Sequence, residues 1–149
     1  MRLFVLIAAI IASGCSMTTA AQNEAVLMFI AAPGLKQSGF PLSNAVEVDG
    51  WIFLSGALGT VPGQGLAPGG IEPETRQTME NIKSLLAGQG LGMERIVKCT
   101  AMLADMAEWP AFNAVYKEFF TENYPARSAF AVQGLAANAR VEVECIARR

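Results

Sequence analysis

The chain has 149 residues, of which 52% are hydrophobic and 16% are charged, and its formal net charge is −2. This length favours one domain, and the low charged fraction excludes a disordered chain. The sequence contains no histidine, which excludes His-assisted nucleophiles, His-ligated zinc sites and a histidine general base. It also has neither a cysteine spacing typical of a metal site nor a Lys/Arg cluster, so we expect no metal and no nucleic-acid partner.

Residues 1–14 are typical of a bacterial lipoprotein signal peptide. Met1-Arg2 is followed by a ten-residue apolar run over residues 3–12, which is shorter than the roughly 20 residues that cross a membrane. The run ends in Ala12-Ser13-Gly14-Cys15, which resembles a lipobox. We therefore expect cleavage before Cys15, lipidation of Cys15, a tether over 15–24 and a domain over 25–149.

Ordinary signal cleavage, for instance after Ala20, is the alternative to lipidation. Either route predicts export to the periplasm, with the membrane reached only through the lipid anchor. Cys99 and Cys145 are then the two remaining cysteines. An exported pair can form a disulfide, but both lie in apolar, strand-like runs, and this favours two buried thiols.

The first half of the domain shows strand and turn signals. The apolar run 25–31 predicts a buried strand. Residues 44–48 and 51–55 flank Asp49-Gly50, the sequence typical of a two-residue type I′ hairpin. The stretch 56–70 is rich in glycine and proline and predicts a long loop.

A helix is predicted next, beginning at Pro73, because proline suits a first helical position. Its end is predicted at Gly88 and Gly90. Four apolar residues recur at helical spacing along it: Met79, Ile82, Leu85 and Leu86.

The second half predicts a strand, a helix and two further strands. The strand is predicted over 96–103, with Val97, Cys99, Ala101 and Leu103 on one face. A helix is predicted over 108–121, capped by Asp105, and its buried face is formed by Phe112, Val115, Tyr116 and Phe119. Strands at 127–132 and 140–146, joined by 133–139, are predicted to form a closing hairpin. The order of the elements predicts an α+β fold, a single mixed sheet with two helices on one face.

Two charged positions on the last strands are candidates for chemistry. Glu142 and Glu144 alternate with apolar residues and point away from the core, which is also the pattern of a solvated sheet face. Arg127 lies two residues after Pro125. It is either the partner of a surface ion pair or a binding group whose guanidinium holds a carboxylate through two parallel hydrogen bonds. The predicted hairpin would bring Arg127 within reach of one glutamate.

The most specific motif of the chain is Tyr124-Pro-Ala-Arg-Ser128, with a glutamate fifteen positions after the arginine. Together with several other segments, it resembles the Rid/YjgF family, the reactive-intermediate imine deaminases also labelled L-PSP endoribonuclease-like. The resemblance extends from about residue 40 to the end of the chain. Its other segments are Asp49–Gly56, Thr75–Ile82, Asp105–Phe120 and Val141–Ala147.

The resemblance implies a chorismate-mutase-like fold, a barrel-like homotrimer and sites in the clefts between subunits. It implies hydrolysis of 2-imino acids and their enamine tautomers to 2-oxo acids and ammonia, without a cofactor. Arg127 would bind the substrate carboxylate and Glu142 would activate water, with Ser55 and Gly56 as a pocket wall.

Three positions depart from the family pattern. Ala129 stands where active members commonly have cysteine, Leu42 replaces a tyrosine after Pro41, and Ala57 replaces a frequent glutamine. These changes predict a more apolar pocket and a bulkier substrate side chain. A non-catalytic trimeric binder of carboxylate metabolites in the cell envelope is the alternative function, while an acidic chain without histidine gives no physical support to a ribonuclease.

Overall fold

The computed structural model describes residues 25–32, 35 and 39–149. The predicted signal peptide, the lipidation site Cys15 and the tether lie outside these residues. Over the described part of the chain, no helix is long and apolar enough to cross a membrane. The same residues contain no group of three or more Cys, Asp or Glu side chains placed to hold a metal ion.

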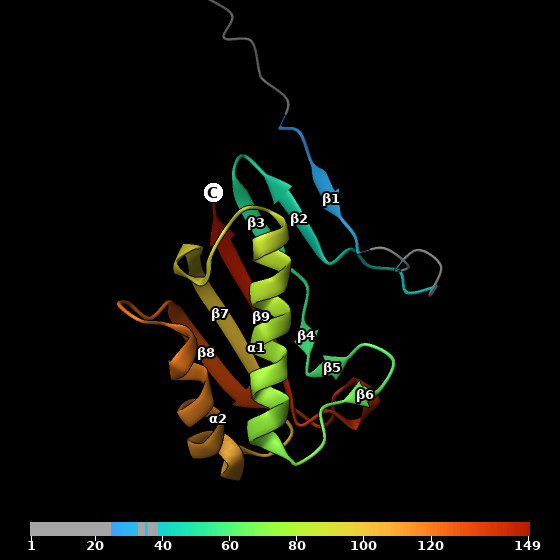
Figure 1. Ribbon diagram of the computed structural model, residues 1–149, viewed down its shortest axis with the longest axis vertical. Helices are drawn as coiled ribbons and strands as arrows, with labels where there is room; N and C mark the ends of the chain where they lie inside the picture. The colour runs from blue at the N-terminus through green and yellow to red at the C-terminus, as the bar shows by residue number, and fades with distance from the viewer. Residues whose placement is uncertain (1–24, 33–34, 36–38) are drawn as a thin grey trace, which may run out of the picture.

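One mixed sheet forms the centre of the domain (Figure 1). Only the β7–β8 pair is parallel, and all other neighbours are antiparallel. In spatial order the strands are β1 (Met28–Ile30), β2 (Ala45–Val48), β3 (Trp51–Leu54), β9 (Val141–Arg148), β7 (Ile96–Leu103) and β8 (Ala126–Ala131), and β4 (Ala57–Leu58) also pairs with β9.

Helices α1 (Ile71–Gly88) and α2 (Trp109–Tyr116) lie side by side on one face of this sheet (Figure 1). A separate small ladder joins β5 (Thr60–Val61) to β6 (Gly65–Leu66). The predicted α+β fold with helices on one face is therefore confirmed. Short 3-10 turns complete the elements: η2 (Met93–Arg95), η3 (Met106–Glu108), η4 (Lys117–Phe119) and η5 (Ala136–Asn138).

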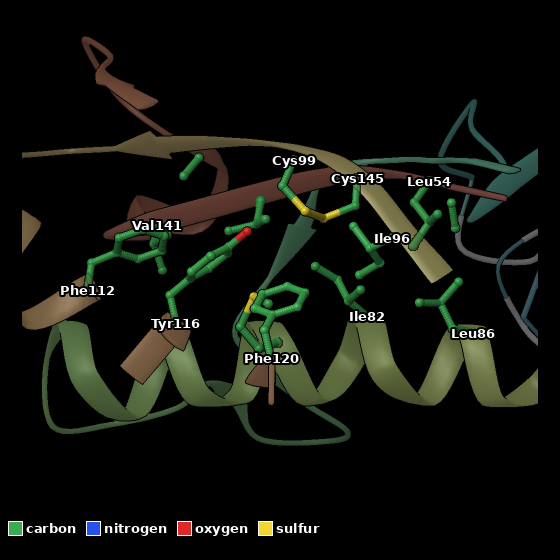
Figure 2. Close-up of a cluster of buried hydrophobic side chains, with 14 of the residues drawn as sticks. Leu54, Ile82, Leu86, Ile96, Cys99, Phe112, Tyr116, Phe120, Val141 and Cys145 are labelled. Carbon is green, nitrogen blue, oxygen red and sulfur yellow. A yellow bond between two sulfur atoms is a disulfide. The ribbon is translucent and has the colours of Figure 1, made fainter. Parts of the chain in front are cut away.

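The core lies between the helices and the sheet (Figure 2). From α1 it takes Met79, Ile82 and Leu86, which are fully buried as their helical spacing predicted, while Leu85 is only partly buried. From α2 it takes Phe112 and Tyr116, and from the strands it takes alternate residues such as Val141, Val143 and Ala147. Among the residues that the structure describes, no helix lies on the opposite face of the sheet (Figure 1).

The β2–β3 hairpin has the predicted turn. Asp49 and Gly50 have φ values of 49° and 75°, as a type I′ turn requires at both central positions. Strand β1, in contrast, is three residues long and exposed, whereas a buried strand was predicted. It lies at the edge of the sheet, where only β2 pairs with it.

Two predicted boundaries in the middle of the chain are wrong. Helix α1 begins at Ile71, two residues before Pro73, because the first helical turn has free N–H groups and tolerates a proline. The predicted loop 56–70 contains β4, β5 and β6. These strands have two residues each, and β4 forms by pairing with the distant β9, which local composition does not reveal.

The predicted closing hairpin is also wrong, because β7 lies between β8 and β9. Strand β8 pairs with β7 in parallel, and β9 pairs with the other edge of β7. The preceding helix α2 ends at Tyr116 and continues as the turn η4, so it is shorter than predicted. A parallel pair needs a long crossover connection, and here α2 and the turn after it provide that connection.

The predicted inward face of β7 is correct at Cys99, Ala101 and Leu103 but wrong at Val97. Val97 is 40% exposed. The register of β7 against β9 shifts between Ile96 and Lys98, and such an irregularity reverses the side-chain alternation on one side of it. Asp105 was predicted to cap the helix over 108–121, but it caps the preceding turn η3, since its carboxylate accepts a hydrogen bond from the Ala107 N–H at 2.8 Å. Helix α2 itself begins after Glu108, which makes no side-chain capping bond.

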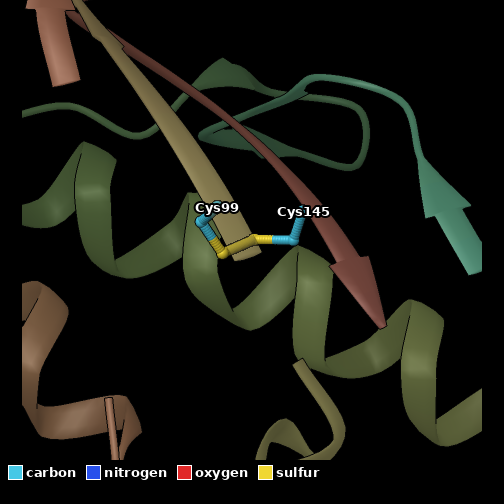
Figure 3. Close-up of a disulfide and its surroundings, with 2 residues drawn as sticks. All are labelled: Cys99 and Cys145. Carbon is cyan, nitrogen blue, oxygen red and sulfur yellow. A yellow bond between two sulfur atoms is a disulfide. The ribbon is translucent and has the colours of Figure 1, made fainter. Parts of the chain in front are cut away.

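Cys99 and Cys145 form a disulfide, so the preferred prediction of two buried thiols is wrong (Figure 3). The two residues are direct partners on β7 and β9, with their Cα atoms 4.1 Å apart. Both side chains are buried. Apolar surroundings are compatible both with free buried thiols and with a cross-strand disulfide. What decides between them is the register of β7 and β9, which places Cys99 directly opposite Cys145.

Glu74 fixes the beginning of β9 and is expected to be important for stability. It is 3% exposed, and its Oε1 accepts hydrogen bonds from the N–H of Arg140 at 2.7 Å and of Val141 at 3.4 Å. Glu74→Ala should lower the free energy of unfolding by about 2 kcal/mol, because these buried donors lose their acceptor. Urea denaturation measures the change.

The control is Glu72→Ala, in the same first turn of α1 but exposed. It removes a comparable charge near the helix N-terminus and should cost no more than about 1 kcal/mol. Equal losses from the two variants would contradict the anchoring role of Glu74.

Candidate active site

Arg127 lies on β8 with its side chain on the helix-covered face, under α2. Its guanidinium carbon is 4.8 Å from the centre of the Trp109 ring, 5.4 Å from that of Phe112 and 4.5 Å from that of Tyr116. These distances are within the range of cation–π contact. Three aromatic side chains of one helix therefore hold the guanidinium in a defined position.

Asn113 also holds Arg127, and sequence reasoning missed it. Its Oδ1 accepts a hydrogen bond from Arg127 Nη2 at 2.7 Å. Asn113 lies four residues after Trp109 and three before Tyr116, so all three belong to one face of α2. That spacing was a signal in the sequence, but only the packing of α2 on β8 gives it a meaning.

No carboxylate pairs with Arg127 among the residues that the structure describes. Arg127 is only partly buried and lies on an edge strand. Ala129, two residues further along β8, is on the same face and packs partly against the core. We call Arg127, Asn113, Trp109, Tyr116 and Ala129 the arginine cluster.

Glu142 lies on the opposite face of the sheet. It alternates with the fully buried Val141 and Val143, and its register partners are Met102 on β7 and Leu58 on β4. Arg127, in contrast, is in register with Cys99. Within one chain the sheet therefore separates the two residues that were predicted to act together.

Ser55 and Gly56 do lie beside Glu142, at an irregularity of the sheet. Phe53 pairs with Ile146 and Ala57 with Val143, so the β3–β4 side has one residue more than β9, which is a β-bulge. Gly56 is packed so closely on Glu142 that a methyl group at its Cα would come within 2.8 Å of the glutamate carboxyl carbon. The φ of Gly56 is not positive, so backbone conformation does not explain a glycine at this position. The close approach of the Glu142 side chain does.

The Ser55 side chain ties this bulge to the segment before β2. Its hydroxyl donates to the carbonyl of Ser43 at 2.6 Å, and its N–H donates to the carbonyl of Asn44 at 2.9 Å. Leu42 immediately precedes Ser43 and is half exposed. Glu142 and Gly56, with Ser55 next to Gly56 in the bulge, make up what we call the glutamate cluster.

Ala57 does not contribute to this cluster. Its partner on β9 is Val143, which is fully buried, and Ala57 packs against the core. The prediction of a more apolar pocket therefore depends on Leu42 and Ala129 alone.

Burial, and secondarily the negative charge of Glu144, raises the pKa of Glu142 above its ordinary value of 4.5. Glu144 lies on the same exposed face two residues along β9. Arg127 is not a cause of the shift, because it lies on the other side of the sheet. A carboxylate with a raised pKa accepts a proton more readily, so Glu142 is suited to act as a general base.

Gly56→Ala should displace the Glu142 carboxylate, because the new methyl group and the carboxyl group would overlap. We expect kcat/KM for the reaction proposed below to fall by roughly tenfold or more, since a small misplacement of a reacting group is costly. Steady-state kinetics measures the loss.

Gly88→Ala is the matched control, at the end of α1 in open space. It should leave kcat/KM unchanged. Wild-type kinetics in Gly56→Ala would show that Glu142 has no defined position in the reaction.

Comparisons with known proteins identify the family of the chain. The family model Endoribonuclease L-PSP matches residues 35–149. The 2-iminobutanoate/2-iminopropanoate deaminase of goat (Capra hircus) is 44% identical over 108 residues, which are 72% of this chain and 79% of the goat protein. The human protein of the same name is 38% identical over the same shares of the two chains.

Solved structures with the same fold include that of TdcF of E. coli with bound serine. It superposes with a TM-score of 0.70 at 30% identity, over 81% of this chain and 93% of TdcF. A yeast structure, YEO7, reaches a TM-score of 0.77 at 32% identity, over 83% and 99% of the two chains. The chain belongs to the Endoribonuclease L-PSP family, the family of Rid/YjgF proteins.

Proposed function

We propose that this protein hydrolyses 2-imino acids to 2-oxo acids and ammonia. The observation that carries the proposal is the guanidinium of Arg127, which aromatic rings hold in place and which no described carboxylate neutralises. An arginine in this state is suited to bind a carboxylate through two parallel hydrogen bonds. The relatives named 2-iminobutanoate/2-iminopropanoate deaminase support the proposal that this carboxylate belongs to an imino-acid substrate.

The chemical step needs a positioned water molecule and a base. With its carboxylate on Arg127, the substrate presents an electrophilic imine carbon. Glu142 takes a proton from water as the oxygen bonds to this carbon. That proton passes to the nitrogen and leaves a carbinolamine. Glu142 then takes the hydroxyl proton as the C=O bond forms, this proton passes to the nitrogen, the C–N bond breaks, and a 2-oxo acid and ammonia leave. The enzyme gains or loses no electrons in this step.

The two clusters must meet across a boundary between copies of the chain, because the sheet separates them within one copy. We propose a homotrimer in which the arginine cluster of one copy faces the glutamate cluster of the next. The open face of the sheet carries a row of apolar side chains in register across four strands, namely Phe29, Val46, Phe53 and Ile146. An exposed apolar row of this kind supports burial against a second copy.

The substrate side chain is proposed to be larger than that of 2-iminopropanoate. Ala129 lies in the arginine cluster, and Leu42, next to Ser43 in the sequence, is proposed to add a second apolar group to the pocket. We also propose that the protein is exported, as a lipoprotein modified at Cys15 or as a periplasmic protein. The Cys99–Cys145 disulfide supports this, because disulfides persist in oxidising compartments.

An amino-acid oxidase that generates imines in the presence of the purified protein tests the reaction. We expect faster release of 2-oxo acid than in buffer, with more acceleration for leucine-derived than for alanine-derived imine. No acceleration with either imine would overturn the proposal, and tight binding of a 2-oxo acid without turnover would favour a carboxylate binder. Light scattering tests the trimer, and a monomer at assay concentration would contradict the shared site.

A further inference from the structure

The disulfide lies in the same cross-strand row as the proposed substrate-binding arginine. Cys99 on β7 is in register with Arg127 on one side and with Cys145 on the other. All three side chains point to the helix-covered face. The row thus links the edge strand that carries Arg127 to β9, which carries Glu142 on its other face.

The position of Arg127 depends on β7. Strand β8 is at the edge, and within the described sheet β7 is the strand that pairs with it. The S–S bond clamps β7 to β9 at the row of Arg127. A change in the β7–β9 spacing at this row therefore moves the strand on which Arg127 lies.

The packing around the disulfide transmits the same change to the aromatic side of the arginine. Cys99 and Cys145 are 0% and 2% exposed and belong to the packed core between the helices and the sheet. Tyr116 lies in this core and stacks on the Arg127 guanidinium at 4.5 Å. Its hydroxyl is buried without a hydrogen-bond partner in the described structure and points toward the strands that carry the disulfide (Figure 2).

Two separate thiols occupy more space than a bonded pair. Unbonded sulfur atoms rest at van der Waals contact, well beyond the S–S bond length of roughly 2.0 Å. In a close-packed core this expansion has to displace neighbours. Cys99 and Cys145 lie on β7 and β9, and Tyr116 belongs to the same core, so the expansion acts on strands and packing that also hold the arginine cluster.

We propose that Cys99 and Cys145 form a thiol–disulfide switch that sets the geometry of the Arg127 anion site, with the oxidised state competent and the reduced state loosened. In oxidation the two thiols lose two protons and two electrons to the disulfide of an exchange partner, which becomes a dithiol. A dithiol reductant reverses the step. Because both cysteines are buried, exchange in either direction takes place while the β7–β9 pair is transiently open. The effect on catalysis rests on the proposed deaminase function, whereas the effect on the arginine cluster does not.

The test compares oxidised and reduced protein. The Trp51→Phe variant leaves Trp109 as the one tryptophan of a chain that has two. The disulfide is reduced with dithiothreitol in mild urea, and the urea is removed under reductant. Thiol labelling confirms two more free cysteines than in the oxidised protein. Because Trp109 stacks on Arg127, we expect its emission maximum to shift on reduction.

Kinetics and unfolding give the other two readouts. Reduction should raise KM for imino acids by roughly tenfold, the effect of a displaced binding group, with a smaller effect on kcat. It should lower Tm by roughly 10 °C, since the bond closes a loop of 46 residues. A fall in Tm alone would also follow from a purely structural disulfide. The Trp109 emission maximum and KM therefore distinguish a switch from a structural bond.

The double variant Cys99→Ala/Cys145→Val is the matched control, because it keeps the total core volume nearly constant. It should not respond to dithiothreitol in any of the three measurements. An unchanged Trp109 emission and KM in folded, fully reduced protein would overturn the switch, and so would an equal response in the double variant. If the protein lacks deaminase activity, the proposed function is wrong. The response of Trp109 emission to reduction then still tests the switch.

Discussion

Arg127→Lys is expected to lower kcat/KM for imino-acid hydrolysis by about 10²–10³-fold. Lysine keeps the positive charge but replaces two parallel charge-assisted hydrogen bonds by a single point contact. It also loses the planar stacking on Trp109 and Tyr116 and the hydrogen bond to Asn113. Initial rates over a range of imine concentrations measure the loss, and most of it should appear in KM.

Arg76→Lys provides the comparison, since Arg76 forms an exposed ion pair with Glu118 across α1 and η4. Such pairs contribute little, and activity should stay within about twofold of wild type. If Arg127→Lys retained wild-type KM, the substrate carboxylate would have to bind elsewhere.

Glu142→Gln is expected to lower kcat by about 10²–10⁴-fold, the range for removal of a general base. Glutamine has nearly the same size, so the packing of Gly56 on this side chain is preserved and KM should change little. Single-turnover and steady-state assays with the same imine distinguish the two parameters. A kcat within threefold of wild type would mean that another group activates the water.

The pH dependence of kcat/KM provides a second test of Glu142. Activity requires the ionised carboxylate, so it falls as the pH drops through the pKa of this group. Burial and Glu144 raise that pKa, and the acid limb should therefore lie above the ordinary 4.5. Glu144→Gln removes one of the two causes and should move the limb to lower pH, whereas an upward shift would contradict the assignment.

Arg127 and Glu142 can each be found from the sequence, but their placement on opposite faces of the sheet cannot. Tyr124-Pro-Ala-Arg-Ser128 and the glutamate fifteen residues after the arginine are local patterns. The predicted hairpin placed them together within one chain. The parallel pairing of β8 with β7 instead puts a strand between them and turns their side chains to opposite faces.

Asn113 and Gly56 show the same limit at the level of single contacts. Asn113 lies on an apolar helix and was not predicted, and Gly56 was predicted as part of a pocket wall but not as a contact of Glu142. Their roles arise because α2 lies over β8 and because an extra residue at Ser55–Gly56 brings the backbone against Glu142. Neither contact joins residues that are close in the sequence.

The sequence by itself determined the features that depend on neighbours along the chain. These are the buried stripe of α1, the Asp49-Gly50 turn, the limits of β7 and the α+β class, because helical periodicity, turn conformation and strand alternation are local properties. Only the tertiary structure decided the strand order, the register that joins Cys99 to Cys145, and the face on which Arg127 lies. Those depend on pairings between segments dozens of residues apart, and many alternative pairings satisfy the same local patterns equally well.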